Sequence, residues 1–334
     1  MYVMPKNQTV PPGCQQAVVA IGNFDGVHLG HQKLLEAAEQ QAKTLGKPLG
    51  VLTFEPHPRS LFRPDEPVFR LSPPAWKARL LKGLGVQCLD VATFDRDLAG
   101  LEAEEFVKQI LVERLAVCHV VTGYDFHFGR GRKGSPDTMR QLGKQYGFGV
   151  TIVDQVTDDD GVAPFSSSAI RTALRRGHVQ KAASQLGHWW SIMGTVVKGD
   201  QRGRSIGYPT INMALEPGCE PHEGIYAVRV RSADRNDTSV WNGAGYIGYR
   251  PTFETEQLFL EVFIFDFDKD VYGQEFIVEF IDFIRPDKRF DTLDGLLEQM
   301  KKDCQQIETQ LSAFADNNPV KNYPLGALQA EGKL

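Results

Sequence analysis

The sequence has few cysteines, and their spacing does not indicate a cross-linked or zinc-binding protein. The 334 residues include five cysteines, at Cys14, Cys88, Cys118, Cys219 and Cys304. Disulfide-rich scaffolds and zinc sites place cysteines in close pairs, which this sequence lacks. We therefore expect reduced, packed thiols, without a disulfide framework or a zinc site.

Long apolar runs and a strong charge of either sign are also missing. No apolar stretch approaches the ~18 residues that a membrane-spanning helix needs. The formal net charge is −5 and the pI is near 5.9, which argues against bulk binding to nucleic acid or to an anionic membrane. We expect a cytoplasmic protein without membrane or nucleic-acid partners, in which any phosphate site is local. Self-association stays open.

The length indicates more than one domain, because a single core stops growing at ~250–300 residues. The hydrophobic fraction of 42% and the charged fraction of 24% are ordinary for globular proteins. We expect a first domain over residues 1–187, a second over 188–315, and a loosely ordered tail over 316–334. The tail prediction follows from Asn, Pro and Gly without apolar periodicity.

The two halves show different secondary-structure patterns. In the first, β-branched runs at 17–21, 51–54 and 117–122 alternate with helical patterns at 34–45 and 103–115, which indicates βαβ units and a parallel sheet. After Trp189, strand-like stretches at 192–197, 210–213, 225–230, 239–247, 258–267 and 276–284 predict a sandwich or barrel. Asp291 or Thr292 then caps a final helix with an apolar stripe.

The first candidate site is the turn after the strand at 17–21. This turn joins the carboxyl end of a strand to the start of a helix, where ligands bind in open α/β sheets. His28 and His31 lie three apart there, beside backbone N–H groups and a helix dipole that favour an anion. Gly30 permits close approach, and either imidazole can donate a hydrogen bond to a phosphate oxygen. The alternative is that both histidines are capping surface residues.

The second candidate site begins in the stretch 194–212, which contains four glycines and several cations. Such a loop can wrap a polyphosphate through its backbone amides, although similar loops are often solvent-facing turns. Thr210 and Asn212 are two apart on a predicted strand, so both face the same side. Their oxygens suit a hard cation such as the Mg²⁺ that bridges ATP phosphates.

Glu261 is the third feature. Alternation along the strand at 258–267 places it on the face of Phe259, Phe263 and Phe265, where an unpaired carboxylate would be costly. Burial raises a carboxyl pKa toward the range of a general base that takes a proton from an alcohol. The alternative is a core glutamate that an arginine or a backbone donor satisfies.

Several motifs resemble a known family. The string His28-Leu29-Gly30-His31 is similar to the HxGH motif of nucleotidyltransferases. The lead-in from Gly22 and the segments at 54–58, 123–129 and 166–171 resemble the bacterial bifunctional riboflavin kinase and FAD synthetase family. In the second half, Pro209-Thr210-Ile211-Asn212, Arg250-Pro251-Thr252-Phe253 and Glu261 resemble its riboflavin kinase module.

This resemblance implies a Rossmann-like nucleotidyltransferase domain followed by a β-barrel riboflavin kinase domain with a C-terminal helix. The first would adenylylate FMN to FAD and the second would phosphorylate riboflavin to FMN, with ATP as co-substrate and Mg²⁺ as cofactor. In the first, His28 and His31 would stabilise the α-phosphate of ATP. The residues that would hold the ATP phosphates are Gly22, Asn23, Phe24, Gly30, Ser166, Ser167, Ser168 and Arg171. His57 and Asp125 would line the flavin or adenine side.

In the second domain, Thr210 and Asn212 would bind the magnesium ion and Glu261 would activate the ribityl hydroxyl. The residues that would bind ATP are Gly194, Lys198, Gly199, Gly203, Arg204, Gly207 and Pro209. Three positions depart from the family pattern, which commonly has a basic residue at Ala169, a histidine at Phe263 and a small polar residue at Tyr246. Two alternatives stay open: a nucleotidyltransferase for another phosphorylated metabolite, or a non-catalytic flavin-binding regulator.

Overall fold

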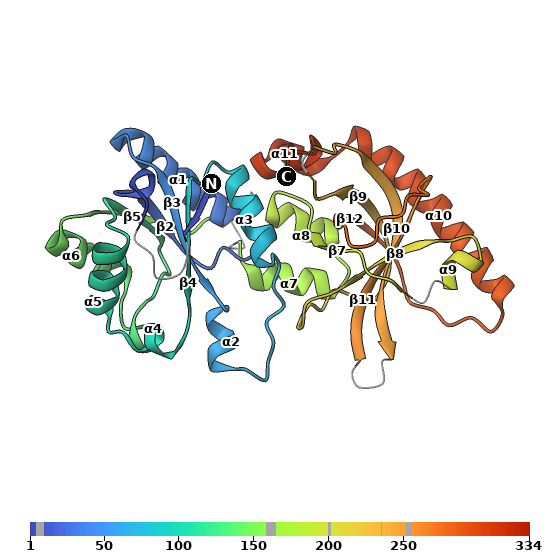
Figure 1. Cartoon of the computed structure of the whole chain (residues 1–334), viewed down its shortest axis with the longest axis horizontal. Helices are drawn as coiled ribbons and strands as arrows, with labels where there is room; N and C mark the ends of the chain where they lie inside the picture. The colour runs from blue at the N-terminus through green and yellow to red at the C-terminus, as the bar shows by residue number, and fades with distance from the viewer. Residues whose placement is uncertain (5–9, 158–164, 200–201, 235, 252–255) are drawn as a thin grey trace. The chain divides into compact units, whose positions relative to one another are not determined.

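The computed structural model describes the whole chain except residues 5–9, 158–164, 200–201, 235 and 252–255. The chain forms two compact units (Figure 1), one of Met1–Val68 with Lys77–Phe165 and one of Phe69–Trp76 with Ser166–Leu334. The second unit begins before the expected boundary at residue 187, because the helices α7 (Ser167–Arg175) and α8 (Val179–Leu186) contribute buried side chains to its core. The boundary between the two functional modules stays a prediction.

The first unit contains a parallel sheet in the order β1-β4-β3-β2-β5-β6. Its strands are β1 (Tyr2–Met4), β2 (Val18–Ile21), β3 (Leu49–Glu55), β4 (Cys88–Thr93), β5 (His119–Gly123) and β6 (Gly149–Val153). Its longer helices are α1 (Leu29–Leu45) and α6 (Pro136–Tyr146). Strand β2 pairs with β3 on one side and β5 on the other, which makes its carboxyl end a topological switch point. The Rossmann-like expectation is confirmed.

The second unit contains an antiparallel sheet in the order β7-β12-β9-β10-β11-β8. Its strands are β7 (Ser191–Thr195), β8 (Thr210–Ala214), β9 (Gly224–Ser232), β10 (Val240–Pro251), β11 (Glu256–Ile264) and β12 (Glu275–Pro286). A single bridge between Val197 and Asn212 brings the two edges together, with the Val197 N–H donating to the Asn212 carbonyl over 2.8 Å. All six predicted strands are present, and the sheet is a nearly closed barrel. The helix α10 (Leu293–Asp316) begins at Thr292, whose hydroxyl accepts the Gly295 N–H.

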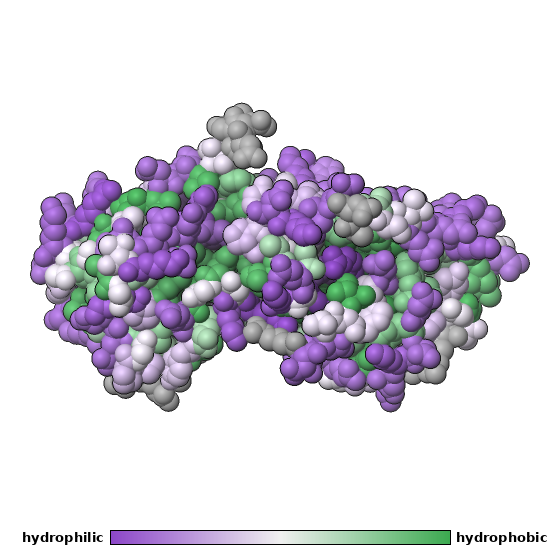
Figure 2. Space-filling view, turned by 90° about the horizontal axis from the view of Figure 1, so that it is seen from above, coloured by the Kyte–Doolittle hydropathy of each residue, from purple (hydrophilic) through white to green (hydrophobic). Residues whose placement is uncertain are grey.

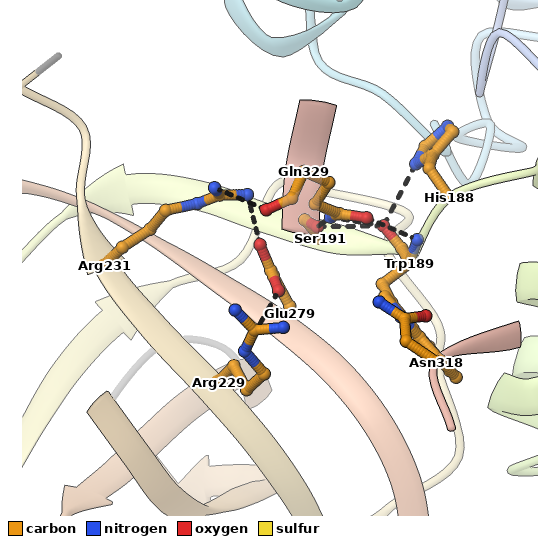
Figure 3. Close-up of polar contacts among 8 residues, drawn as sticks. All are labelled: His188, Trp189, Ser191, Arg229, Arg231, Glu279, Asn318 and Gln329. Atoms are coloured by element: carbon orange, nitrogen blue, oxygen red, sulfur yellow. Dashed lines mark hydrogen bonds and ion pairs between the residues drawn. The ribbon is translucent and has the colours of Figure 1, made fainter. Parts of the chain in front are cut away.

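The prediction of a loosely ordered tail is wrong. After α10 the chain forms a 3-10 helix (Pro319–Asn322) and α11 (Pro324–Ala330), and Val320 and Leu325 are buried. Figure 3 shows Gln329 of α11 against the start of β7. Its Oε1 accepts the Trp189 N–H over 2.7 Å, and its Nε2 donates to the Ser191 hydroxyl over 3.0 Å. A helix this short depends on tertiary contacts, which composition does not reveal.

A buried ion pair lies under the same helix. Arg231 and Glu279 are 3% and 1% exposed and pair with each other across β9 and β12. Arg231 also donates from Nη1 to the carbonyl of Gln329 over 3.1 Å (Figure 3). Buried charges need such partners because their desolvation is costly. The C-terminal helix therefore supplies one of the hydrogen-bond acceptors of this buried arginine.

The expectation of unpaired thiols is wrong for two cysteines. Cys14, just before β2, and Cys88, at the start of β4, form a disulfide with 5.8 Å between their Cα atoms. Their separation of 74 residues gives no local signal. Cys118, Cys219 and Cys304 are free thiols.

The face of the molecule drawn in Figure 2 is mainly polar. Hydrophilic residues cover much of the face drawn in Figure 2, and apolar residues appear between them in separate patches. Within the described part of the chain, no helix is both long enough and apolar enough to cross a bilayer.

Candidate active sites

The turn between β2 and α1 has an unusual backbone. Phe24 and Val27 have φ angles of 49° and 45°, and Gly26 lies between them at 82°. The left-handed conformation is strained for a β-branched residue such as Val27. Both apolar side chains are fully buried, and the Thr53 hydroxyl donates to the Asn23 carbonyl over 3.1 Å. The surrounding core therefore fixes this turn, and such strain commonly marks functional sites.

The turn brings His28 and His31 together. His28 is the N-cap of α1, and its Nδ1 accepts the His31 N–H over 3.4 Å. The two rings stack with their centroids 3.7 Å apart. A Cβ on Gly30 would lie 3.2 Å from the His28 ring, so any larger residue would crowd this packing. The capping alternative holds for His28, but it does not describe the stacked pair.

The electrostatics favour an uncharged His31. Burial, followed by the neighbouring His28 and Lys77, lowers the pKa of His31 well below its usual value. Its Nδ1 atom is buried without a hydrogen-bond partner among the residues that the structure describes. Lys77 is 5% exposed and pairs with Glu55 over 2.9 Å. The site thus combines a helix N-terminus, a buried cation and an imidazole nitrogen that can bind a ligand.

Two other predicted residues of the first site, Gly22 and His57, have local hydrogen-bond partners. The Gly22 N–H donates to the Leu52 carbonyl. His57 caps the short helix α2 (Pro58–Phe62), with its Nδ1 accepting the Arg59 N–H over 3.2 Å. Asp125 is exposed and follows β5. Since β3 and β5 flank β2 in parallel, His57 and Asp125 follow strands that end at the same sheet edge as the histidine turn.

The serine run and Arg171 belong to the second compact unit. Ser166 caps α7 by accepting the Ala169 N–H over 3.2 Å, and Ser167 and Ser168 form the first turn of that helix. Arg171 donates from Nε to the Phe69 carbonyl over 2.6 Å within the same unit. These contacts account for the start of α7 and for the anchoring of the 69–76 segment.

A pocket of about 270 Å³ lies at the seam of the barrel. Gly199, Pro209, Thr210 and Asn212 all line it, together with residues 267–272. A Cβ on Gly199 would lie 2.6 Å from the Asn212 side chain, so only a glycine lets the loop backbone approach this closely. The structure thus gathers the two expected metal ligands and part of the glycine-rich loop.

Among the described residues expected to bind ATP, Gly194, Lys198, Gly203 and Gly207 do not line this pocket. A Cβ on Gly203 would lie 2.2 Å from the Tyr208 carbonyl oxygen, and Gly207 has a φ of 86°. These glycines are therefore required by a tight turn. Gly194 lies in β7, and exposed Lys198 lies 5.8 Å from the Tyr272 ring centroid. The side chain of Arg204 and the whole of Thr252 and Phe253 lie outside the described residues.

Glu261 lies on the face shared with Phe259 and Phe263, as expected, but that face is only half-buried. The burial argument for Glu261 is therefore wrong, because the barrel interior takes the alternate residues, including Leu260 and Val262. Across the ladder, Glu261 pairs with Asn212 of β8. Glu261 therefore lies next to Asn212, one of the two expected metal ligands, but it does not line the 270 Å³ pocket.

Comparison with known proteins relates these sites to a family. The FAD synthetase family model matches residues 11–169 and the riboflavin kinase family model matches 186–311. A relative from Bacillus subtilis is 40% identical over 298 residues, covering 87% of this chain and 91% of its own. An Escherichia coli K12 relative is 38% identical over 297 residues, covering 89% and 92%. Both are named bifunctional riboflavin kinase/FMN adenylyltransferase. This chain belongs to that family.

A solved structure titled as a macrolide-efflux protein from Streptococcus pneumoniae is also similar, with 32% identity and a TM-score of 0.80. The match covers 92% of this chain and 99% of that one. The histidine turn lies within the region that matches the FAD synthetase model. Thr210, Asn212 and Glu261 fall in the riboflavin kinase part.

Sequence reasoning missed one residue in the adenylyltransferase part. Lys77 is 22 residues from Glu55 and farther from the histidines, and no motif spacing connects them. From the sequence alone, a lysine in an ordinary helical pattern is predicted to be exposed at the surface. Only its burial and its effect on His31 indicate a role.

Proposed function

We propose that this enzyme phosphorylates riboflavin beside Thr210, Asn212 and Glu261, and adenylylates the resulting FMN beside His28 and His31, with ATP as co-substrate in both steps. The observation that supports this most directly is the coexistence of two separate phosphate-type sites. One is a histidine pair at a switch point, and the other is a pocket at a barrel seam. Each falls within the matching family domain.

In the adenylylation step, a phosphate oxygen of FMN attacks the α-phosphorus of ATP and pyrophosphate leaves. The nucleophile is already an anion, so the site must position it and neutralise charge. His28 and a neutral His31 donate N–H hydrogen bonds to the α-phosphate, and Lys77 and the start of α1 add positive potential. The roles of the remaining residues in ATP and flavin binding are proposed from the family resemblance alone: Gly22, Asn23, Phe24, Gly30, His57, Asp125, Ser166, Ser167, Ser168 and Arg171.

In the kinase step, Glu261 accepts the proton of the terminal ribityl hydroxyl, whose oxygen attacks the γ-phosphorus of ATP while ADP leaves. The Thr210 hydroxyl and the Asn212 amide oxygen suit Mg²⁺, which prefers hard oxygen ligands and neutralises phosphate charge when bound. The Asn212 Nδ2 donates to the Thr210 carbonyl over 3.3 Å, which orients this amide. ATP binding by Gly194, Lys198, Gly203, Arg204 and Gly207 is proposed on the resemblance, while Gly199 and Pro209 also line the pocket.

Two single variants test the division of labour. With riboflavin, ATP and magnesium, His31→Ala should accumulate FMN without FAD, whereas Glu261→Ala should form no FMN but still convert supplied FMN to FAD. His178→Ala and Glu308→Ala alter exposed residues of the same types and should behave as the wild type. Chromatography separates the three flavins. Equal loss of both activities in either variant would contradict the assignment.

Chelation tests the proposed metal. Removal of magnesium with a chelator should stop both steps, and added Mg²⁺ should restore them. A kinase rate that is indifferent to the chelator would remove the basis for Thr210 and Asn212 as ligands. We also propose a cytoplasmic location, because both reactions consume ATP.

A further inference from the structure

A tyrosine lies beside Glu261 and has no role in the proposed chemistry. In the β10–β11 ladder, Tyr246 is directly opposite Glu261, and in the β11–β8 ladder Glu261 is opposite Asn212. The three residues therefore form a row across neighbouring strands on one face of the sheet. Directly opposite residues place their Cβ atoms about 4.5–5.5 Å apart. The Tyr246 side chain thus borders the carboxylate that we propose as the base.

The packing of β10 fixes the ring of Tyr246. A Cβ on Gly248 would lie 2.1 Å from the tyrosine hydroxyl oxygen and 2.4 Å from Cζ. The ring therefore lies along the strand over Gly248, in space that any larger residue would occupy. Because Gly248 is buried beneath it, the hydroxyl has a defined position on this half-buried face.

Asp287, in the turn after β12, is the partner of this hydroxyl. The Tyr246 hydroxyl donates to Asp287 Oδ2 over 3.4 Å, longer than the roughly 2.7–2.8 Å typical of such bonds. The other oxygen, Oδ1, accepts the Lys288 N–H over 2.8 Å, which orients the carboxylate. The hydroxyl is therefore held between Gly248 and an oriented carboxylate.

The surroundings keep this hydroxyl protonated. Burial, then Asp287, Glu223 and Glu261, raise the pKa of Tyr246 to about 12. The side chain is therefore a neutral hydroxyl at physiological pH. While it donates to Asp287, its oxygen can accept a hydrogen bond from another hydroxyl.

We propose that Tyr246 is a substrate-positioning residue of the kinase site, which binds a secondary hydroxyl of the ribityl chain next to the terminal hydroxyl that Glu261 activates. The inference rests on the proposed role of Glu261. A polyol chain has several rotatable bonds, and a hydroxyl held over Gly248, on the same face as the base, selects the conformer that presents its end to ATP. Asp287 acts through Tyr246 and does not contact the substrate.

The test compares two flavins in the full-length enzyme. One is riboflavin, and the other carries a 5-hydroxypentyl group at N10, which keeps the terminal hydroxyl and lacks the secondary ones. Tyr246→Phe should raise KM for riboflavin about three- to tenfold, the effect of one hydrogen bond. Its kcat should stay within about twofold, and KM for the hydroxypentyl flavin should be unchanged.

Controls and a second variant make the outcome decisive. Tyr249→Phe changes an exposed tyrosine of the same strand and should leave both KM values unchanged. Asp287→Ala, which removes the acceptor, should raise KM for riboflavin in the same way, and the double variant should show no further increase, because both changes act through one hydroxyl. Conversion of supplied FMN to FAD should be unaffected in every variant.

Two outcomes would overturn the inference. One is an equal KM change for both flavins in Tyr246→Phe, and the other is no change for riboflavin. Either result leaves the role of Glu261 intact if Glu261→Ala still abolishes FMN formation. Kinase activity retained in Glu261→Ala would instead refute the proposed function itself.

Discussion

The replacement Gln329→Ala would show how far the C-terminal helix stabilises the second unit. The Gln329 side chain is 1% exposed and makes three hydrogen bonds. It accepts the Trp189 N–H over 2.7 Å and donates to the Trp189 carbonyl over 3.1 Å and to the Ser191 hydroxyl over 3.0 Å. Alanine removes all three hydrogen bonds. It keeps the backbone carbonyl of residue 329, which accepts a hydrogen bond from Arg231.

The expected cost follows from what remains unpaired. The Trp189 carbonyl keeps a contact with His188 Nδ1 at 3.0 Å and with the Ser191 hydroxyl at 2.9 Å, so its loss is partly compensated. The Trp189 N–H loses the acceptor that the structure shows, and a buried unsatisfied group costs about 1–3 kcal/mol. The lost hydrogen bonds to the Trp189 carbonyl and to the Ser191 hydroxyl cost less, because these two groups keep other partners. Together, we expect the free energy of unfolding of this unit to fall by about 2–6 kcal/mol.

Tryptophan fluorescence is a selective assay for this unit. The chain has four tryptophans, and all of them belong to the second unit: Trp76, Trp189, Trp190 and Trp241. Urea unfolding followed by this signal should show a lower midpoint with an unchanged slope. Gln305→Ala, on an exposed position of α10, is the matched control and should stay within about 0.5 kcal/mol of wild type. If Gln329→Ala and Gln305→Ala unfolded at the same urea concentration, the hydrogen bonds of the Gln329 side chain would not stabilise the barrel.

Two further predictions concern the first unit. The pKa of His31 is lowered in the folded state, so the unfolded chain binds the proton more readily. The free energy of unfolding should therefore be highest above pH ~6.5, the usual pKa of histidine, and should fall as the pH is lowered through that value. Circular dichroism melts at pH 7.5 and 5.5 should show a smaller loss in His31→Gln than in wild type, and an identical loss would refute the assignment. The Cys14–Cys88 disulfide should contribute about 2–4 kcal/mol to the free energy of unfolding, which dithiothreitol or Cys14→Ser removes and Cys118→Ser does not. A non-reduced digest should contain the linked peptide, and its absence under oxidising conditions would contradict the pairing.

The sequence by itself determined what depends on local spacing. Alternation of apolar residues predicted all six strands of the barrel, and βαβ alternation predicted the parallel sheet. His28 and His31 are close because three residues span about one helical turn, and Thr210 and Asn212 share a face because strand residues alternate. These relations hold wherever the element forms, so the residue order alone is sufficient.

Only the tertiary structure decided the contacts between distant segments. The hydrogen bond from Trp189 to Gln329 spans 140 residues, the disulfide spans 74, and Lys77 reaches Glu55 over 22. The half-buried face of Glu261 was decided in the same way, because both faces of β11 carry apolar side chains and only the closure of the barrel chooses which one is inside. Such choices depend on which surfaces pack together, and no periodicity within a single element encodes them.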